Sequence, residues 1–509
     1  MRRSEVRSRV VCFALALATA GTLALAPVRA AADIHDQVTL TLSDRARGEF
    51  VDWFAPPANN APAGVQRYDF FSNQLRVGAK VKAPHTLLTV EVQQTQFVNL
   101  PNDASLADRR LPQGNLGPGA LYYFNTHQRD QGEVFLKQAN MQVSDLAGLS
   151  GSTATLGRFE YSDGLETIPT DPVLAWLKRA RIGERLVGPF GYTQVTRSFD
   201  GGRLAYDQPG FNVTAMGLRP TNGGFEVSAN RELEMWLAGL AFTLKGIQGF
   251  VPFDARLFYL YAADQRDRTG VGPALLVDNR STVPSQDALR RRDNGSIDIH
   301  TWGGHVVSVI DFGPGKADGL LWGAVQAGEW GQLHHFAWAY AIEAGYQLPK
   351  IYAAPWLRVG YDQGSGDHDP NDKSHKTFYQ LLPTARLYAQ TPFFNLMNSR
   401  DLFAQLIVKP CGRLTVRTDY HWLRLTSSED LWYAGGGATN DQVFGFTGIA
   451  SHGKRELAHL ADISFTVTIL KQLTAYAYYG RTFGQGVVKA TFPGGANTNY
   501  GYVELTYRY

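Results

Sequence analysis

The last eight residues of the chain, YVELTYRY at positions 502–509, alternate in polarity without a break. One face of an extended strand here would carry Val503, Leu505, Tyr507 and Tyr509. The opposite face would carry Tyr502, Glu504, Thr506 and Arg508. A strand that crosses a bilayer in a closed barrel needs about 9–11 residues, with every second side chain apolar. The segment therefore predicts a barrel strand with one face on lipid and the other on the lumen.

The same alternation recurs along the chain. A half-buried sheet of a soluble protein would also alternate, but its polar face would carry more Lys and less Gly and Ala. We predict eighteen strands, near residues 37–53, 67–82, 86–97, 131–144, 151–160, 190–206, 210–219, 229–245, 254–263, 295–312, 317–328, 332–346, 351–362, 401–409, 412–426, 456–470, 472–484 and 498–509.

The connections between these strands alternate between long and short. Long connections follow the odd strands, at residues 55–66, 99–130, 161–189, 265–294, 363–400 and 427–455. Short turns follow the even strands, at 83–85, 207–209, 313–316, 349–350, 410–411 and 471. Bacterial outer-membrane barrels have long outside loops and short periplasmic turns. The predicted fold class is therefore all-β: a single closed antiparallel transmembrane barrel of about 18 strands.

The N-terminus predicts a secretory signal peptide over residues 1–30. Four Arg precede an apolar stretch at 10–26, and Val28 and Ala30 are the small residues that a signal peptidase requires. Cleavage is expected after Ala30, with Ala32 as the alternative site and an uncleaved membrane anchor as the alternative reading. Residues 31–509 then form the barrel domain, in which no run of 18 apolar residues occurs.

Removal of the signal peptide also changes the charge balance. The full chain has 49 Lys and Arg against 46 Asp and Glu, a formal charge of +3. The signal contains five Arg and one Glu, so 44 basic and 45 acidic residues remain, a net charge of −1. This near-neutral balance argues against a nucleic-acid partner. Cys411 is the one cysteine left, which excludes an intrachain disulfide.

A basic helical pattern interrupts the strands between Pro172 and Leu186. Asp171 is placed to cap this helix and Pro172 suits its first position. The apolar side chains are Val173, Leu174, Leu177, Ile182 and Leu186. The basic ones are Lys178, Arg179, Arg181 and Arg185. We expect the loop 161–189 to fold into the pore, where its cations would concentrate anions. The alternative is a helix on the outer rim that faces water or lipopolysaccharide phosphates.

Two motifs carry a resemblance to a known family. Gly157-Arg158 is followed by Ser162-Asp163-Gly164, a Trp-containing loop, and the run Arg197-Ser198-Phe199-Asp200-Gly201-Gly202-Arg203-Leu204. The second motif is Thr377-Phe378-Tyr379, Leu382-Pro383-Thr384 and Tyr388. Together they resemble the alginate-export family of outer-membrane barrels. The resemblance implies an eighteen-stranded monomer. In the alginate exporters of this broad family, an Arg-lined lumen passes a polyuronate.

Arginine suits such a path because its planar fork binds both carboxylate oxygens. The predicted substrate path consists of Arg45, Arg47, Arg76, Arg158, Lys178, Arg179, Arg181, Arg185, Arg197, Arg203, Arg358 and Arg417. Most of these charges could instead pair with lumen acids and brace the barrel. The directions of Arg197 and Arg203 are ambiguous, because they share a strand face with Phe199.

We predict an outer-membrane channel for anionic or polar solutes, including export of an acidic exopolysaccharide such as alginate. Lipid and lipopolysaccharide are its other expected partners. The alternatives are an uptake porin for small organic acids or sugars, an outer-membrane lipid hydrolase, and a soluble secreted lectin. No catalytic residue, cofactor or metal is predicted. Adjacent His334 and His335 point to opposite faces, and the acidic stretch 362–372 is interpreted as a solvated loop.

Overall fold

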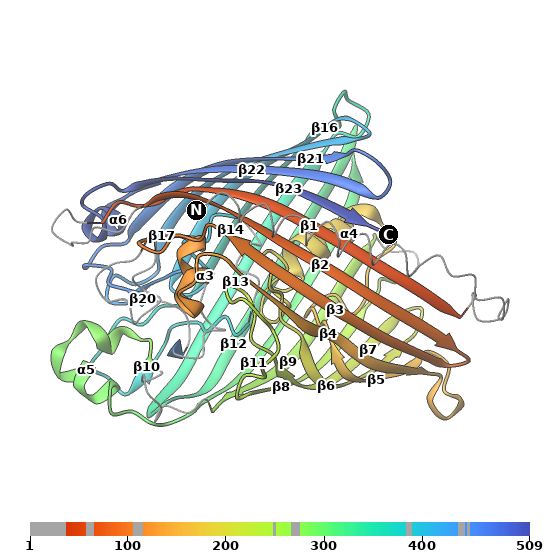
Figure 1. The fold of residues 1–509 in the computed structure, drawn as a ribbon, viewed down its shortest axis with the longest axis horizontal. Coiled ribbons are helices and arrows are strands. Elements are labelled where there is room, and N and C mark those ends of the chain that lie inside the picture. Colours follow the sequence, from red (N-terminus) through yellow and green to blue (C-terminus); the bar gives the residue numbers. More distant parts are fainter. Residues whose placement is uncertain are drawn as a thin grey trace, which may run out of the picture.

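A computed structural model describes residues 37–56, 66–104, 116–247, 251–265, 275–382, 389–435, 443–444 and 448–509. The predicted signal peptide (1–30), Pro383, Thr384 and Tyr388 lie outside these residues. Eighteen long strands form one barrel (Figure 1). They are β1 (Val38–Asp52), β2 (Arg67–Ala83), β3 (Thr86–Val98), β4 (Gln131–Ser144), β5 (Ser152–Phe159), β6 (Phe199–Asp207), β7 (Phe211–Pro220), β8 (Met235–Leu244), β9 (Phe253–Asp264), β11 (Ile297–Phe312), β12 (Gly315–Trp330), β13 (Leu333–Gln347), β14 (Trp356–Gly364), β16 (Ser399–Cys411), β17 (Leu414–Leu425), β21 (Glu456–Thr468), β22 (Leu473–Gly484) and β23 (Asn497–Arg508).

Each of these strands pairs antiparallel with its neighbours in sequence, and β23 closes the barrel on β1. The closing register runs from Ser43 opposite Arg508 to Asp52 opposite Asn499. Closure leaves no exposed sheet edge, which a barrel in lipid requires because hydrocarbon cannot satisfy backbone groups. The predicted fold class and strand count are confirmed.

The remaining elements are short. The helices are α3 (Pro118–Thr126), α4 (Pro172–Leu177), α5 (Pro284–Arg290) and α6 (Gly486–Thr491), with helical turns η3 (Leu146–Gly148), η4 (Lys178–Ile182) and η5 (Asn279–Thr282). Two-residue strands are β10 (Leu275–Leu276), β15 (Ser374–His375), β18 (Trp432–Tyr433), β19 (Val443–Phe444) and β20 (Gly448–Ile449). Among the described residues, no helix has the length and apolar character needed to span a bilayer.

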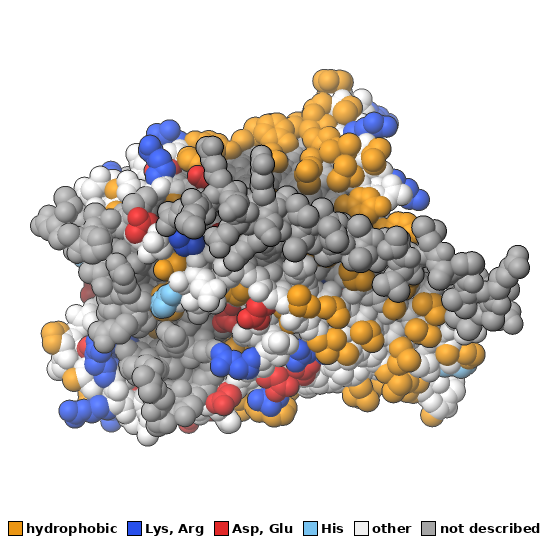
Figure 2. Space-filling view, in the orientation of Figure 1, with side chains coloured by type: hydrophobic (Ala, Val, Ile, Leu, Met, Phe, Trp, Pro, Cys, Tyr) orange, Lys and Arg blue, Asp and Glu red, His pale blue; other side chains and the backbone are white. Residues whose placement is uncertain are grey.

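Exposure alternates along the strands. Leu257 is 70% exposed whereas its neighbour Arg256 is 2% exposed, and Phe336 is 60% exposed beside His335 at 3%. Apolar side chains therefore cover the outside of the barrel while polar side chains are buried inside. Figure 2 shows the hydrophobic side chains gathered over the half of the barrel that carries the short turns, with charged ones toward the long loops. This distribution matches an apolar band in contact with lipid.

Three strand starts differ from the prediction by more than a few residues. Strand β6 begins at Phe199 rather than near residue 190, β8 at Met235 rather than near 229, and β14 at Trp356 rather than near 351. The residues that precede β6 lie inside the barrel, against strands β1 and β2. Val195 pairs with Gly224 there in an isolated bridge. A segment packed on a lumen wall alternates in polarity as a strand does, so polarity alone misplaced the start of β6.

Candidate functional site in the barrel lumen

The connection from β5 to β6, residues 160–198, folds into the lumen; we call it the constriction segment (Figure 1). Its helix α4 begins as predicted. Asp171 Oδ1 accepts hydrogen bonds from Val173 N (2.8 Å) and Leu174 N (3.1 Å), and Pro172 holds the first position. The helix is shorter than predicted: α4 ends at Leu177 and continues as one π-helical turn, η4, to Ile182. The positive φ of Glu184 (61°) excludes further helix.

Lys178 joins the constriction segment to strand β9. Its Nζ donates to both carboxylate oxygens of Asp254 at 2.8 Å and to Thr167 Oγ1 at 2.8 Å. His305 Nε2 on β11 lies 3.1 Å from Asp254 Oδ1. Lys178 and His305 are buried, and so is Asp254. The lysine charge is therefore neutralised by a wall residue and withdrawn from any passing solute.

Arg181 and Arg185 are buried against strand β13. Arg181 Nε lies 3.2 Å from Glu343 Oε2, and Arg185 Nη2 lies 4.0 Å from Glu343 Oε1. Arg358 on β14 also reaches Glu343 at 2.8 Å and forms a second ion pair with Asp318. These arginines and acids brace the segment against the wall.

Arg179 differs from its three basic neighbours because its side chain is exposed. It forms no ion pair with any residue that the structure describes. Of the predicted basic cluster on this loop, Arg179 is thus the residue that solvent can reach.

The second half of the constriction segment lies on strands β1 and β2. Arg45 donates to Gly191 O at 2.8 Å and to Gln194 Oε1 at 3.0 Å. Arg47 donates to Tyr192 O at 2.8 Å and pairs with Glu504 at 2.6 Å. The guanidinium groups therefore hold loop backbone as well as acids.

Arg76 extends this contact from β2. It donates to Thr196 Oγ1 at 2.6 Å and pairs with Glu160 at 3.1 Å. Lys137 on β4 pairs with the same Glu160 at 3.1 Å and is fully buried. One loop carboxylate thus bridges two cations of the barrel wall.

Arg197 connects the constriction segment to a second inward segment, residues 365–382. Its Nη1 donates to Gly188 O at 3.2 Å and to Leu382 O at 2.9 Å, and the side chain is 1% exposed. Leu382 N also donates to Leu186 O at 2.8 Å. Two loops that are far apart in sequence therefore meet inside the barrel and narrow the lumen.

Arg158 does not face the lumen, contrary to the prediction. It lies on the same side of β5 as Leu156, which is 59% exposed, while Phe159 beside it faces inward and is buried. Its guanidinium forms two hydrogen bonds to Asp200, at 2.7 and 2.6 Å, on the outer surface. Phe159 takes the inward position because it belongs to the apolar cluster around the constriction segment. The ion pair between Arg158 and Asp200 therefore joins β5 to β6 on the outer surface.

The remaining predicted residues lie on inner faces. Arg203 is half-buried opposite buried Thr155, and its Nε has no hydrogen-bond partner among the described residues. Arg417 Nε donates to Asp419 Oδ2 at 2.6 Å on the same strand.

Sequence reasoning missed most of the acids that balance these cations, and it missed Arg256. Arg256 Nη2 on β9 pairs with Asp163 at 2.6 Å and with Glu166 at 2.7 Å, both in the constriction segment. The available signal was the position of Arg256 between lipid-facing residues, since every second side chain of β9 points inward.

A closed barrel whose loops fold into its lumen defines the class of outer-membrane channels. The model of the family described as alginate export matches residues 67–488, and the chain belongs to this family. It is a channel of the bacterial outer membrane. No curated protein matches.

Solved structures share the fold. Pseudomonas aeruginosa OccK9 (OpdG) has a TM-score of 0.52 and 11% identity over 93% of this chain and 98% of that one. Pseudomonas aeruginosa OpdK with vanillate has a TM-score of 0.52 and 8% identity, over 92% and 98%. A BenF-like porin from Pseudomonas fluorescens Pf-5 has a TM-score of 0.51 and 8% identity, also over 92% and 98%.

Proposed function

We propose that the channel passes anionic or polar solutes, and that an acidic exopolysaccharide such as alginate is the solute it exports. The observation that carries the proposal is the exposed guanidinium of Arg179 on the constriction segment. An uncompensated cation in a narrow, low-dielectric passage raises the local concentration of anions. A polyuronate presents one carboxylate per sugar, which a guanidinium binds through both oxygens.

The other predicted path residues contribute according to their access to solvent. Arg45, Arg76, Arg203 and Arg417 are partly exposed and can touch a solute, although Arg45, Arg76 and Arg417 also pair with acids. Arg47, Lys178, Arg181, Arg185, Arg197 and Arg358 are buried and position the loops. Anion preference then depends on a few residues rather than on the whole basic set, in agreement with the near-neutral charge of residues 31–509.

The test is ion selectivity in planar bilayers under a KCl gradient. The unmutated channel should prefer chloride, and Arg179→Gln should shift the reversal potential toward potassium. Arg291→Gln is the matched control, because Arg291 is exposed on the outside loop after α5. Cation preference in the unmutated channel, unchanged by Arg179→Gln, would exclude the anionic proposal.

A second candidate is uptake of small organic acids or sugars. The contacts of Leu382 with Leu186 and Arg197 narrow the lumen, and a narrow passage favours small solutes over a polymer. Oligouronates and a small aromatic acid can be compared as blockers of single-channel current. Block by oligouronates alone supports export of the polymer, and block by the small acid alone supports uptake.

We further propose that residues 31–509 act as one monomeric barrel without enzymatic activity. The continuous seam from β1 to β23 supports a single domain. Contact with lipopolysaccharide is proposed for the outer charged surface that includes Arg158 and Asp200.

A further inference from the structure

Inside the barrel there are two pairs of aspartates, and the two members of each pair lie opposite each other on neighbouring strands. Asp419 on β17 lies opposite Asp462 on β21, and Asp362 on β14 lies opposite Asp401 on β16. All four side chains are buried. Like charges directly opposite on adjacent strands are destabilising, and burial strengthens their repulsion. Arg417 bonds to Asp419, and Arg181 and Arg185 of the constriction segment also interact electrostatically with Asp419 and Asp362, respectively. A further cation between the carboxylates would reduce their repulsion more directly.

His421 lies between the two pairs. Its Nδ1 is 2.7 Å from Asp401 Oδ2, so Nδ1 carries the proton and donates it to that carboxylate. The ring is fully buried and packs on Phe403, with 5.7 Å between the ring centres. Its Nε2 has no hydrogen-bond partner in the described part of the chain. A buried ring nitrogen without a partner is costly unless something else binds it.

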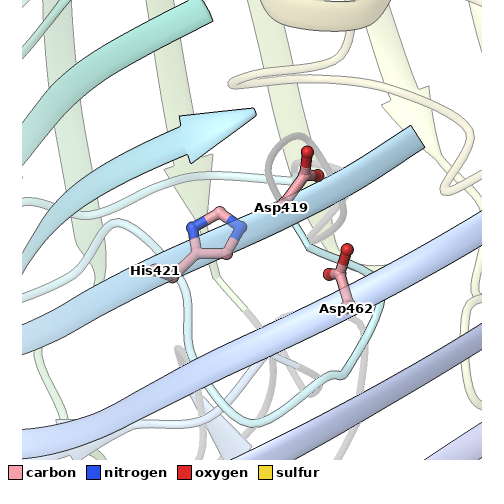
Figure 3. A group of neighbouring side chains, drawn as sticks. All are labelled: Asp419, His421 and Asp462. Atoms are coloured by element: carbon pink, nitrogen blue, oxygen red, sulfur yellow. The ribbon is translucent and has the colours of Figure 1, made fainter. Parts of the chain in front are cut away.

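The free nitrogen of His421 is turned toward Asp419 and Asp462. Figure 3 shows the three side chains converging from the two neighbouring strands. One ligand atom from each residue lies within 4.8 Å of the other two. No hydrogen bond links these three residues in the structure. A cation at about 2.0–2.2 Å from each ligand requires ligand atoms no more than about 4.4 Å apart, so small side-chain shifts bring these three atoms within reach of one ion.

Outer partners orient the two carboxylates. Gln405 Nε2 donates to Asp419 Oδ1 at 2.7 Å, and Tyr478 donates to Asp462 Oδ2 at 3.0 Å. Each carboxylate oxygen retains a second lone pair for a cation. Asp401 orients His421 in a similar way, because a carboxylate bonded to Nδ1 fixes the ring and leaves Nε2 as the ligand atom.

We propose that Asp419, His421 and Asp462 form a binding site for a divalent transition-metal ion such as Zn²⁺, with Asp401 as the positioning residue. An imidazole ligand favours zinc-like ions over Ca²⁺ and Mg²⁺, which prefer oxygen ligands. The ion would neutralise the Asp419 and Asp462 pair and cross-link β17 to β21. Three protein ligands leave a fourth position for water or a solute group.

The test is Zn²⁺ titration calorimetry on the full channel in detergent after chelator treatment, with Ca²⁺ and Mg²⁺ for comparison. We expect one Zn²⁺ per chain and weaker or undetectable binding of the other two ions. His421→Gln and Asp462→Asn should each weaken Zn²⁺ binding at least about 100-fold, and Asp401→Asn about 10- to 100-fold. His459→Gln is the matched control, because His459 lies on β21 and faces Tyr420 on the outside; it should change nothing.

Folding of each variant is checked by its heat-modifiable mobility on gels. Co²⁺ absorption of the unmutated channel adds a readout that needs no variant, since a tetrahedral site with a nitrogen ligand gives intense visible bands. Absence of stoichiometric Zn²⁺ binding, or binding that His421→Gln and Asp462→Asn leave unchanged, overturns the proposal.

Discussion

Lys178 Nζ lies 2.8 Å from each carboxylate oxygen of Asp254, in a buried pair that joins the constriction segment to the barrel wall. Lys178→Met would leave Asp254 buried without its cation, and loss of one partner of such a pair costs about 3–5 kcal/mol. We expect the free energy of unfolding in urea to fall by that amount. Single-channel current should also become noisier as the segment loosens.

The control for this pair is the double variant Lys178→Met with Asp254→Asn. It removes both charges, so most of the lost stability should return. A double variant that is as unstable as Lys178→Met would contradict a charge-based anchor. It would point instead to the contact with Thr167.

Arg197 should control how firmly the two inward segments are joined. Its guanidinium donates to carbonyls of Gly188 and Leu382, and hydrogen bonds from a charged group contribute about 1.5–3 kcal/mol. Arg197→Gln should therefore separate the segments and raise single-channel conductance. Arg179→Gln is the control, since it removes a charge of the same segment but no such bond. Equal conductance changes in both variants would argue against a joining role.

Stability should depend on pH through Asp430, which lies in the outside loop between β17 and β21. Asp430 accepts hydrogen bonds from Thr377 Oγ1 (2.6 Å) and Asp367 N (2.9 Å) and is fully buried. Burial raises the pKa of Asp430 to about 7, because the effect of burial is larger than the opposite effect of the hydrogen bonds from Thr377 and Asp367. The folded chain then holds a proton that the unfolded chain releases near pH 4. This contribution to stability is complete below about pH 4 and is lost as the pH rises to about 7.

The measurement for Asp430 is the melting temperature between pH 5 and 8. The unmutated channel should lose stability relative to Asp430→Asn as the pH rises, because the amide keeps the shape of the carboxyl but does not titrate. The difference in melting temperature between the two proteins should stop changing above about pH 7. Parallel curves over the whole range would show that Asp430 does not titrate there.

The lipid-facing band can be tested with two equally simple substitutions. Leu257 on β9 is 70% exposed and Leu289 on α5 is 57% exposed, but only Leu257 lies on the barrel wall. Leu257→Arg should cost up to about 2–4 kcal/mol when the channel is folded into bilayers. Leu289→Arg should cost almost nothing, because it faces water. Similar losses of stability for both variants would contradict the placement of Leu257 in the lipid-facing band.

Strand order and strand faces could be predicted from the sequence because both depend on local signals. Alternation places Leu505 on lipid and Glu504 in the lumen, and the lengths of the connections separate outside loops from periplasmic turns. The prediction failed for Arg158 and for the starts of β6, β8 and β14. At Arg158 and at the start of β6 an inward loop supplies an apolar surface inside the barrel, so Phe159 turns inward and residues 190–198 pack on the lumen wall instead of extending the strand.

The sequence by itself thus determined the barrel, its eighteen strands and the loop that carries the basic cluster. Only the tertiary structure decided which charges are neutralised. Lys178 meets Asp254, Arg181 meets Glu343, and Asp462 comes opposite Asp419 through strand register and loop packing. Period-two alternation is a property of neighbouring residues, whereas the pairing of Lys178 with Asp254 joins residues 76 positions apart and depends on the closed barrel.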